Sequence, residues 1–133
     1  MIVVDTNLIM YLLIQGERTD EAERVFKADS QWLAPFLWRS EFRNALAFYM
    51  RRGALLLERA VQIMQEAESL MQGNEFVVPS QSVLALTAAS SCSAYDCEFV
   101  ALAQDFGVPL VTADRQVLSE FPTTAVSPEG FNP

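Results

Sequence analysis

Residues 91–115 constrain the fold of this chain more than any other stretch. A polar loop is followed by a helical pattern over 95–106, by a glycine that favours a helix end, and by an apolar run over 108–112 that predicts a buried strand. Asp96 therefore lies at the start of a helix, and Asp114 lies just beyond the end of a strand. In an open α/β sheet both places belong to the carboxyl edge, where such sheets bind ligands.

The same alternation continues along the whole chain. Strands are predicted at 2–4, 31–34, 76–78, 108–112 and 124–126, and helices at 7–14, 19–28, 36–52, 55–72, 81–91, 95–106 and 115–120. Strands that alternate with helices favour parallel pairing in an α/β sandwich. We expect residues 1–133 to form a single domain, with a loose tail at 128–133.

Composition excludes several kinds of chemistry. The chain has no histidine, so histidine bases, serine–histidine or cysteine–histidine nucleophiles and histidine metal motifs are all ruled out. Cys92 and Cys97 are too few for a zinc site without histidine, and they are interpreted as free thiols, with a redox pair as the alternative. Any reaction must therefore use carboxylates, hydroxyls, arginine, backbone groups or a metal.

The net charge of −8 argues against a nucleic-acid partner when it is taken alone, because phosphate binding requires basic side chains. The only lysine is Lys27, but four arginines fall within residues 39–52. A bound cation would also reverse the local sign of an acidic site. The overall charge suits a basic protein partner.

No apolar run approaches the roughly 18–20 residues that a membrane span needs. The first residues have neither a basic segment nor a signal-type cleavage site. We therefore expect a soluble cytoplasmic protein.

Four acidic residues are candidates for a common site: Asp5, Glu41, Asp96 and Asp114. Asp5, Asp96 and Asp114 each have a structural alternative as helix caps, and Glu41 could be a charge at the rim of an apolar helix face. Three of the four nevertheless lie at the carboxyl edge in separate strand–helix segments. Unit charges about 4 Å apart repel by roughly 4 kcal/mol at an effective dielectric near 20. A divalent cation would remove that repulsion, and an all-oxygen ligand set favours Mg²⁺ or Mn²⁺.

Four motifs in this order resemble a known family. They are Val3-Val4-Asp5-Thr6-Asn7, Pro35 six residues before Glu41, Asp96 with Phe99-Val100-Ala101-Leu102-Ala103, and Leu110-Val111-Thr112-Ala113-Asp114-Arg115. The sequence is similar to PIN domains, and specifically to the VapC-type ribonuclease toxins of type II toxin–antitoxin systems. The motifs span nearly the whole chain.

The resemblance implies a three-layer α/β/α sandwich with a parallel sheet of order 3-2-1-4-5. It also implies an endoribonuclease that depends on Mg²⁺ or Mn²⁺ and hydrolyses RNA with a metal-activated water. Asp5, Glu41, Asp96 and Asp114 match the family's catalytic acids. Asp5 and Asp96 are expected to bind the metal directly, and Glu41 and Asp114 directly or through water.

Further residues and partners follow from the same resemblance. Thr6, Asn7 and Thr112 match polar residues around the metal ligands. The implied partners are RNA, a small antitoxin with a basic segment, and a second copy of the chain in a homodimer.

Arg39, Arg43 and Arg115 are candidates for RNA contact, with an ordinary helix-surface role as the alternative. Many relatives carry another acid two positions after Asp114, where this chain has Gln116, so a second metal is in doubt. Cys97 stands where a smaller alanine is common in the family, and we expect it to be tolerated.

Three other functions stay open at this stage. The chain could be an inactive PIN domain that only binds, or a housekeeping RNA-processing nuclease with the same chemistry. A phospho-receiver domain also places an aspartate near its first strand, but it would need a neighbouring acid and a late lysine, whereas Thr6 and Asn7 follow Asp5 and the only lysine is Lys27.

Overall fold

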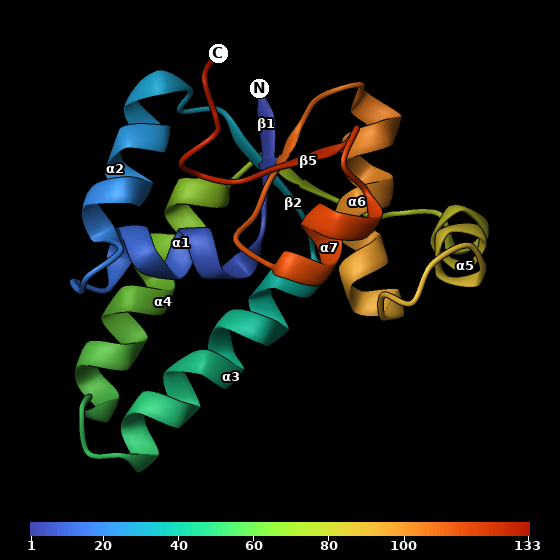
Figure 1. Cartoon of the computed structure of the whole chain (residues 1–133). Coiled ribbons are helices and arrows are strands. Elements are labelled where there is room, and N and C mark those ends of the chain that lie inside the picture. Colours follow the sequence, from blue (N-terminus) through green and yellow to red (C-terminus); the bar gives the residue numbers. More distant parts are fainter.

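The computed structural model describes all 133 residues and contains one five-stranded parallel sheet (Figure 1). The strands are β1 (Ile2–Val4), β2 (Trp32–Pro35), β3 (Glu75–Phe76), β4 (Leu110–Val111) and β5 (Ala125–Val126). Their order is β3-β2-β1-β4-β5, and every neighbouring pair is parallel. This confirms the α/β class and the strand order that the resemblance implied. β1 lies at the centre, where Val3 pairs with Leu33 on one side and Leu110 on the other.

Seven helices connect and cover the strands. They are α1 (Thr6–Leu13), α2 (Thr19–Ala28), α3 (Leu37–Arg51), α4 (Leu57–Met71), α5 (Ser80–Ala88), α6 (Ala94–Phe106) and α7 (Arg115–Glu120). α1, α2 and α4 lie together on one side of the sheet, while α6 lies on the other side with α5 packed against its outer surface (Figure 1). None of the helices combines the length and the apolar character that crossing a bilayer would require.

The ends of α6 follow from local sequence. The hydroxyl of Ser93 accepts a hydrogen bond from the backbone N–H of Asp96 at 3.1 Å, which caps the helix start. Gly107 ends the helix in a left-handed conformation with φ of 65°, which a glycine adopts without steric cost. Asp96 is thereby fixed in the first turn of α6.

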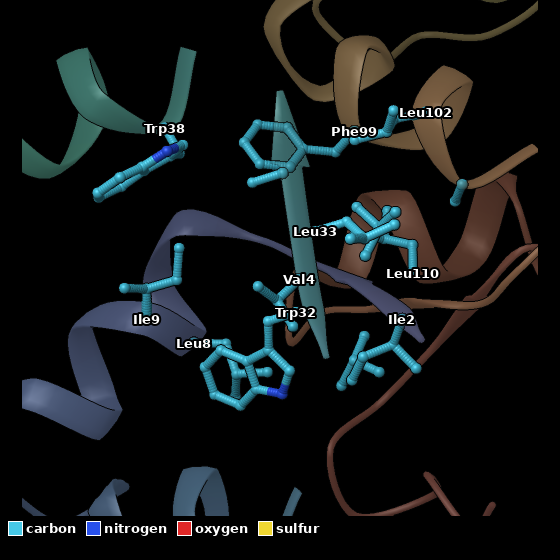
Figure 2. Close-up of a cluster of buried hydrophobic side chains, with 14 of the residues drawn as sticks. Ile2, Val4, Leu8, Ile9, Trp32, Leu33, Trp38, Phe99, Leu102 and Leu110 are labelled. Carbon is cyan, nitrogen blue, oxygen red and sulfur yellow. The ribbon is translucent and has the colours of Figure 1, made fainter. Parts of the chain in front are cut away.

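The core consists of 30 buried residues from both sides of the sheet. The three residues of β1 are all buried, as expected for a central parallel strand covered on both faces. Figure 2 shows Val4 and Leu33 of the sheet among Leu8 and Ile9 of α1 on one side and Phe99 and Leu102 of α6. Trp32, Trp38 and Phe42 are also fully buried, so these aromatic residues belong to the core.

Several element boundaries differ from the sequence prediction. The strand predicted over 108–112 is shorter because the N–H of Val108 donates to the carbonyl of Ala103 and so belongs to the end of α6. β2 runs from Trp32 to Pro35, one residue later at both ends than the predicted 31–34. α5 begins at Ser80, with Pro79 at the capping position.

The C-terminal residues 128–133 were expected to be loose, and the structure differs here. Phe131 is only 6% exposed and joins the core cluster. The guanidinium of Arg24 donates to the carbonyl oxygens of Pro128 and Phe131. The tail is therefore held by one aromatic side chain in the core and by hydrogen bonds from Arg24 of α2 to its carbonyl groups.

Glu75 in β3 joins the sheet to α3. Its carboxylate accepts hydrogen bonds from Arg39 Nε at 2.5 Å, Arg39 Nη2 at 2.8 Å and Trp38 Nε1 at 2.8 Å. The side chain of Glu75 is 7% exposed, and Arg39 also binds Glu68 of α4. The hydrogen bonds from Arg39, and then the one from Trp38, outweigh the effect of burial and hold the pKa of Glu75 below its usual value.

We expect Glu75→Gln to lower the free energy of unfolding by about 2 kcal/mol, because a bidentate pair with Arg39 is broken and a buried acceptor is replaced by an amide. The exposed pair of Arg59 and Glu66 is the matched control, and Glu66→Gln should cost less than about 0.5 kcal/mol. Urea unfolding of the three proteins measures both effects. Equal stability of the Glu75 variant and the wild type would contradict this assignment.

Candidate active site

A pocket of about 130 Å³ opens at the carboxyl edge of the sheet, beside the ends of β1 and β4. It collects every acidic and polar residue that the sequence singled out for the metal site: Asp5, Thr6, Asn7, Glu41, Asp96, Thr112 and Asp114. Ala45, Phe99, Leu110 and Val117 form its apolar walls, and no lysine or arginine lines it. The four carboxylates come from four different parts of the chain, so the fold alone brings them together.

Asp5 follows β1 and caps α1. Its Oδ1 accepts a hydrogen bond from the N–H of Leu8 at 2.9 Å, and its Oδ2 accepts one from the hydroxyl of Thr112 at 2.5 Å. The same hydroxyl oxygen accepts from the N–H of Asp114 at 3.1 Å. Because β1 and β4 are parallel neighbours, Thr112 connects the acidic residues at the ends of the two strands.

Asp114 and Glu41 approach the pocket from two helices. Asp114 caps α7, where its Oδ1 accepts a hydrogen bond from the N–H of Val117 at 3.0 Å. Glu41 lies in the second turn of α3, and its Oε1 accepts a hydrogen bond from the buried hydroxyl of Thr6 at 2.7 Å. Asp5 and Asp114 therefore cap helices and also line the pocket.

The carboxylates in the pocket repel one another, and this repulsion adds to the rise in pKa that burial causes in three of them. Burial raises the pKa of Asp5, Glu41 and Asp96 above their usual values. The charge of Asp114 adds to the rise for Asp5 and for Asp96, and the charges of Asp96 and Asp5 add to the rise for Glu41. Hydrogen bonds from Thr112, Thr6 and Ser93 oppose these shifts without reversing them. The pocket thus holds negative charge that the protein does not neutralise.

This arrangement contrasts with the carboxylates elsewhere in the chain. Glu75, Glu21 and Glu66 each form an ion pair with an arginine. Within the pocket the strongest compensation comes from neutral hydroxyl and amide donors. The donor set is therefore that of a site for a hard cation, which prefers oxygen ligands.

No three acidic side chains are gathered closely enough to enclose an ion by themselves. A cation held here would therefore need water ligands as well as protein ligands, as Mg²⁺ does when only one or two carboxylates bind it. Asp5 keeps lone pairs on both oxygens after its two hydrogen bonds, so it can still act as a ligand. The residues present fit a partly hydrated cation.

The three arginine candidates lie in different environments. Arg39 is bound by Glu75 and Glu68 and does not line the pocket. Arg43 is exposed on α3, with its Nε donating to the carbonyl of Arg39. Arg115 is exposed at the start of α7, next to Asp114, and has no ion pair.

One basic residue near the site was not predicted. The charge of Arg18 lowers the pKa of Asp5 slightly against the dominant effect of burial. Its guanidinium lies 4.8 Å from the ring centre of Tyr11 and binds Glu21 at 2.9 Å. No sequence pattern marks Arg18, because its approach to the site depends on how the loop after α1 folds back.

Comparison with known proteins places this geometry in a family. The family model described as "PIN domain" matches residues 2–122. The chain is 29% identical over 124 residues to Ribonuclease VapC3 of Pyrobaculum aerophilum, covering 91% of this chain and 95% of that protein.

Two solved structures share the fold at lower sequence identity. PAE2754 from Pyrobaculum aerophilum superimposes with a TM-score of 0.76 at 22% identity, covering 96% of this chain and 90% of the other. A toxin–antitoxin complex from Klebsiella pneumoniae gives a TM-score of 0.68 at 18% identity, covering 96% of this chain and 98% of the matched chain. Since the family match extends over nearly the whole chain, and the acidic pocket occupies the sheet edge where the resemblance placed it, this protein belongs to the PIN-domain family.

Proposed function

We propose that this protein is a divalent-metal-dependent endoribonuclease that hydrolyses phosphodiester bonds in RNA. The observation that carries the proposal is a pocket lined by four carboxylates and by no basic side chain. The likeness to Ribonuclease VapC3 supports the choice of RNA as substrate. Mg²⁺ is the proposed cation, with Mn²⁺ as a substitute of the same ligand preference.

In this proposal Asp5 and Asp96 hold the cation directly, while Glu41 and Asp114 bind it directly or through water. Bound there, the cation would lower the pKa of a water ligand and polarise a phosphoryl oxygen, which is the chemistry that phosphodiester hydrolysis requires. Thr112 orients Asp5 through its donated hydrogen bond, and this fixes which lone pairs face the pocket.

Glu41 keeps one carboxylate oxygen free for the pocket. Its Oε1 is held by Thr6, and its Oε2 has no hydrogen-bond partner within the protein. In the metal-free protein, burial and then the neighbouring carboxylates raise the pKa of Glu41 above its usual value, and a bound cation would oppose this rise. Arg43 and Arg115 are the remaining candidates for contact with the RNA backbone.

We further propose that the protein is the toxin of a toxin–antitoxin pair in the cytoplasm and that it forms a homodimer. The similarity to a chain of a toxin–antitoxin complex supports a protein partner, and the net charge of −8 favours a basic segment in that partner. An apolar groove of about 340 Å³ between α3 and α4, with Leu57 and Val61 exposed along it, offers a surface for a protein contact.

Asp5→Asn and Asp96→Asn should each reduce the rate of RNA cleavage on the order of 100-fold, because each change removes a direct ligand of the cation. Asp105→Asn on the exposed side of α6 is the matched control and should leave the rate unchanged. Cleavage of a fluorescent single-stranded RNA in Mg²⁺ and in EDTA measures the effect. Undiminished cutting by either site variant would rule out the assignment.

The metal-free protein should become more stable as the pH falls from neutral toward the ordinary carboxyl pKa of about 4. The raised pKa values of Asp5, Glu41 and Asp96 mean that folding takes up protons in this window, above the ordinary carboxyl pKa of about 4. Glu75 acts in the opposite direction, because its pKa is lowered. Its contribution to stability is lost only at a pH below the ordinary carboxyl pKa.

Replacing one of these charges should therefore stabilise the metal-free fold at neutral pH. Asp96→Asn is expected to raise the midpoint of thermal unfolding in EDTA at about pH 7.5 and to flatten its pH dependence. Asp105→Asn again serves as the control. A lower midpoint for Asp96→Asn would show that its charge is neutralised in the folded chain, contrary to the proposal.

Expression of the chain alone should arrest bacterial growth, and co-expression with the reading frame immediately upstream should relieve the arrest. The Asp96→Asn protein should be harmless in both settings, because its toxicity would require RNA cleavage. Sequencing of cleaved RNA ends after induction identifies the target. Normal growth on induction of soluble wild-type protein would favour a housekeeping nuclease over a toxin.

A further inference from the structure

A group of hydrogen bonds next to the acidic pocket joins α7 to the loop between α5 and α6. Glu120 Oε1 accepts from the N–H of Ser91 at 2.9 Å, and Glu120 Oε2 accepts from the hydroxyl of Ser91 at 2.5 Å. Gln116 Nε2 donates to the carbonyl of Ser91 at 2.8 Å and to its hydroxyl oxygen at 3.0 Å. The thiol of Cys92 also donates to Glu120 Oε2 at 3.4 Å. We call Ser91, Gln116 and Glu120 the Ser91 clamp.

The Ser91 clamp connects the loop before α6 to both ends of α7, and Asp96 and Asp114 lie at the starts of these two helices. Ser91 lies two residues before Ser93, the cap of α6, and Asp96 is in the first turn of that helix. Gln116 lies two residues after Asp114, the cap of α7. Gln116 and Glu120 are four positions apart and therefore share one face of α7. Both carboxylates are thus within a few residues of the clamp.

The two helix starts need such a connection for two reasons. α7 has only six residues, and a helix of that length is not stable without tertiary contacts. Asp96 and Asp114 also repel each other across the pocket, as the effect of Asp114 on Asp96 indicates. In the absence of a neutralising side chain, repulsion would tend to separate the helix starts.

We propose that Glu120 and Gln116 are positioning residues that act through Ser91 to fix the separation of Asp96 and Asp114, and so set the affinity of the pocket for its divalent cation. This inference rests on the proposed function and deepens it. None of the three clamp residues lines the pocket, so their effect passes through the positions of the two carboxylates.

The chemistry of the clamp explains why position 116 is an amide in this chain. The hydroxyl of Ser91 has one proton, which it donates to Glu120, so its second contact has to come from a donor. Gln116 supplies that donor, whereas a carboxylate at the same position would face acceptors at both contacts. Position 116 therefore serves the clamp and supplies no further acidic ligand to the pocket.

The test measures Mn²⁺ binding to the full-length, metal-free protein by titration calorimetry, together with the Mg²⁺ concentration that half-saturates RNA cleavage. Glu120→Gln, Ser91→Ala and Gln116→Glu should each weaken Mn²⁺ binding about 10-fold, the size of effect that residues supporting metal ligands commonly have. The Mg²⁺ requirement should rise in parallel, with the rate at saturating Mg²⁺ largely kept. Ser91→Thr preserves the hydroxyl and should bind Mn²⁺ as the wild type does.

A metal-independent measurement accompanies the titration. Amide hydrogen exchange over residues 90–97 of the metal-free protein should become faster in Glu120→Gln and Ser91→Ala, because the start of α6 loses its connection to α7. Glu66→Gln is the matched control, since it removes an exposed ion pair within α4 and should leave both Mn²⁺ affinity and this exchange unchanged. All measurements are made well below the unfolding midpoint of each variant.

Wild-type Mn²⁺ affinity in Glu120→Gln and Ser91→Ala, or unchanged exchange over residues 90–97, would overturn the proposal. Tighter Mn²⁺ binding by Gln116→Glu would also overturn it, because position 116 would then act as a ligand. A wild-type protein that binds Mn²⁺ but cuts no RNA would refute the proposed function and leave the clamp standing. A wild-type protein that binds no divalent ion would refute both.

Discussion

The carboxylates at the carboxyl edge of the sheet repel one another, and the chain places no basic side chain among them. Burial and the neighbouring carboxylates raise the pKa of Asp5, Glu41 and Asp96, so keeping these groups ionised together costs the fold stability. The surrounding structure shows how the fold tolerates this cost. Thr6 and Thr112 donate to two of the carboxylates, and the backbone at two helix starts donates to Asp5 and Asp114. These neutral donors orient the charges without cancelling them, which leaves room for a cation to do so.

Much of this site could be predicted from sequence because its residues stand at positions with local signals. Asp5 and Asp114 directly follow apolar runs, and Asp96 begins a helical pattern after a serine cap. Parallel strands then force these positions to one edge. Glu41 could be predicted for a different reason. The arginines two positions away on either side point to other faces of α3, so they do not neutralise its charge. In the structure Arg39 is bound to Glu75, and Arg43 is on the exposed surface.

The parts that could not be predicted are side-chain pairings between distant segments. Arg39 and Glu75 are 36 positions apart and have no shared periodicity, so the sequence does not reveal that Arg39 is paired with a residue of β3. The contact between Ser91 and Glu120 spans 29 positions and depends on where a short helix docks. Phe131 similarly looked like part of a loose tail, because a single aromatic residue after a proline carries no strand or helix pattern. Such contacts are decided by packing, which periodicity does not record.

The distribution of charge links the proposed substrate to the proposed partner. RNA phosphates are repelled by a pocket of free carboxylates and attracted once a divalent cation occupies it, whereas a basic peptide segment prefers the pocket without the cation. The cation and a basic peptide segment would each reduce the negative charge that attracts the other, so each must weaken the other's binding by the same factor. An antitoxin with a basic segment would therefore inhibit by lowering the affinity for the cation as well as by covering the pocket. Because the Ser91 clamp is proposed to set the spacing of Asp96 and Asp114, it would also set how strongly the cation and the antitoxin weaken each other's binding.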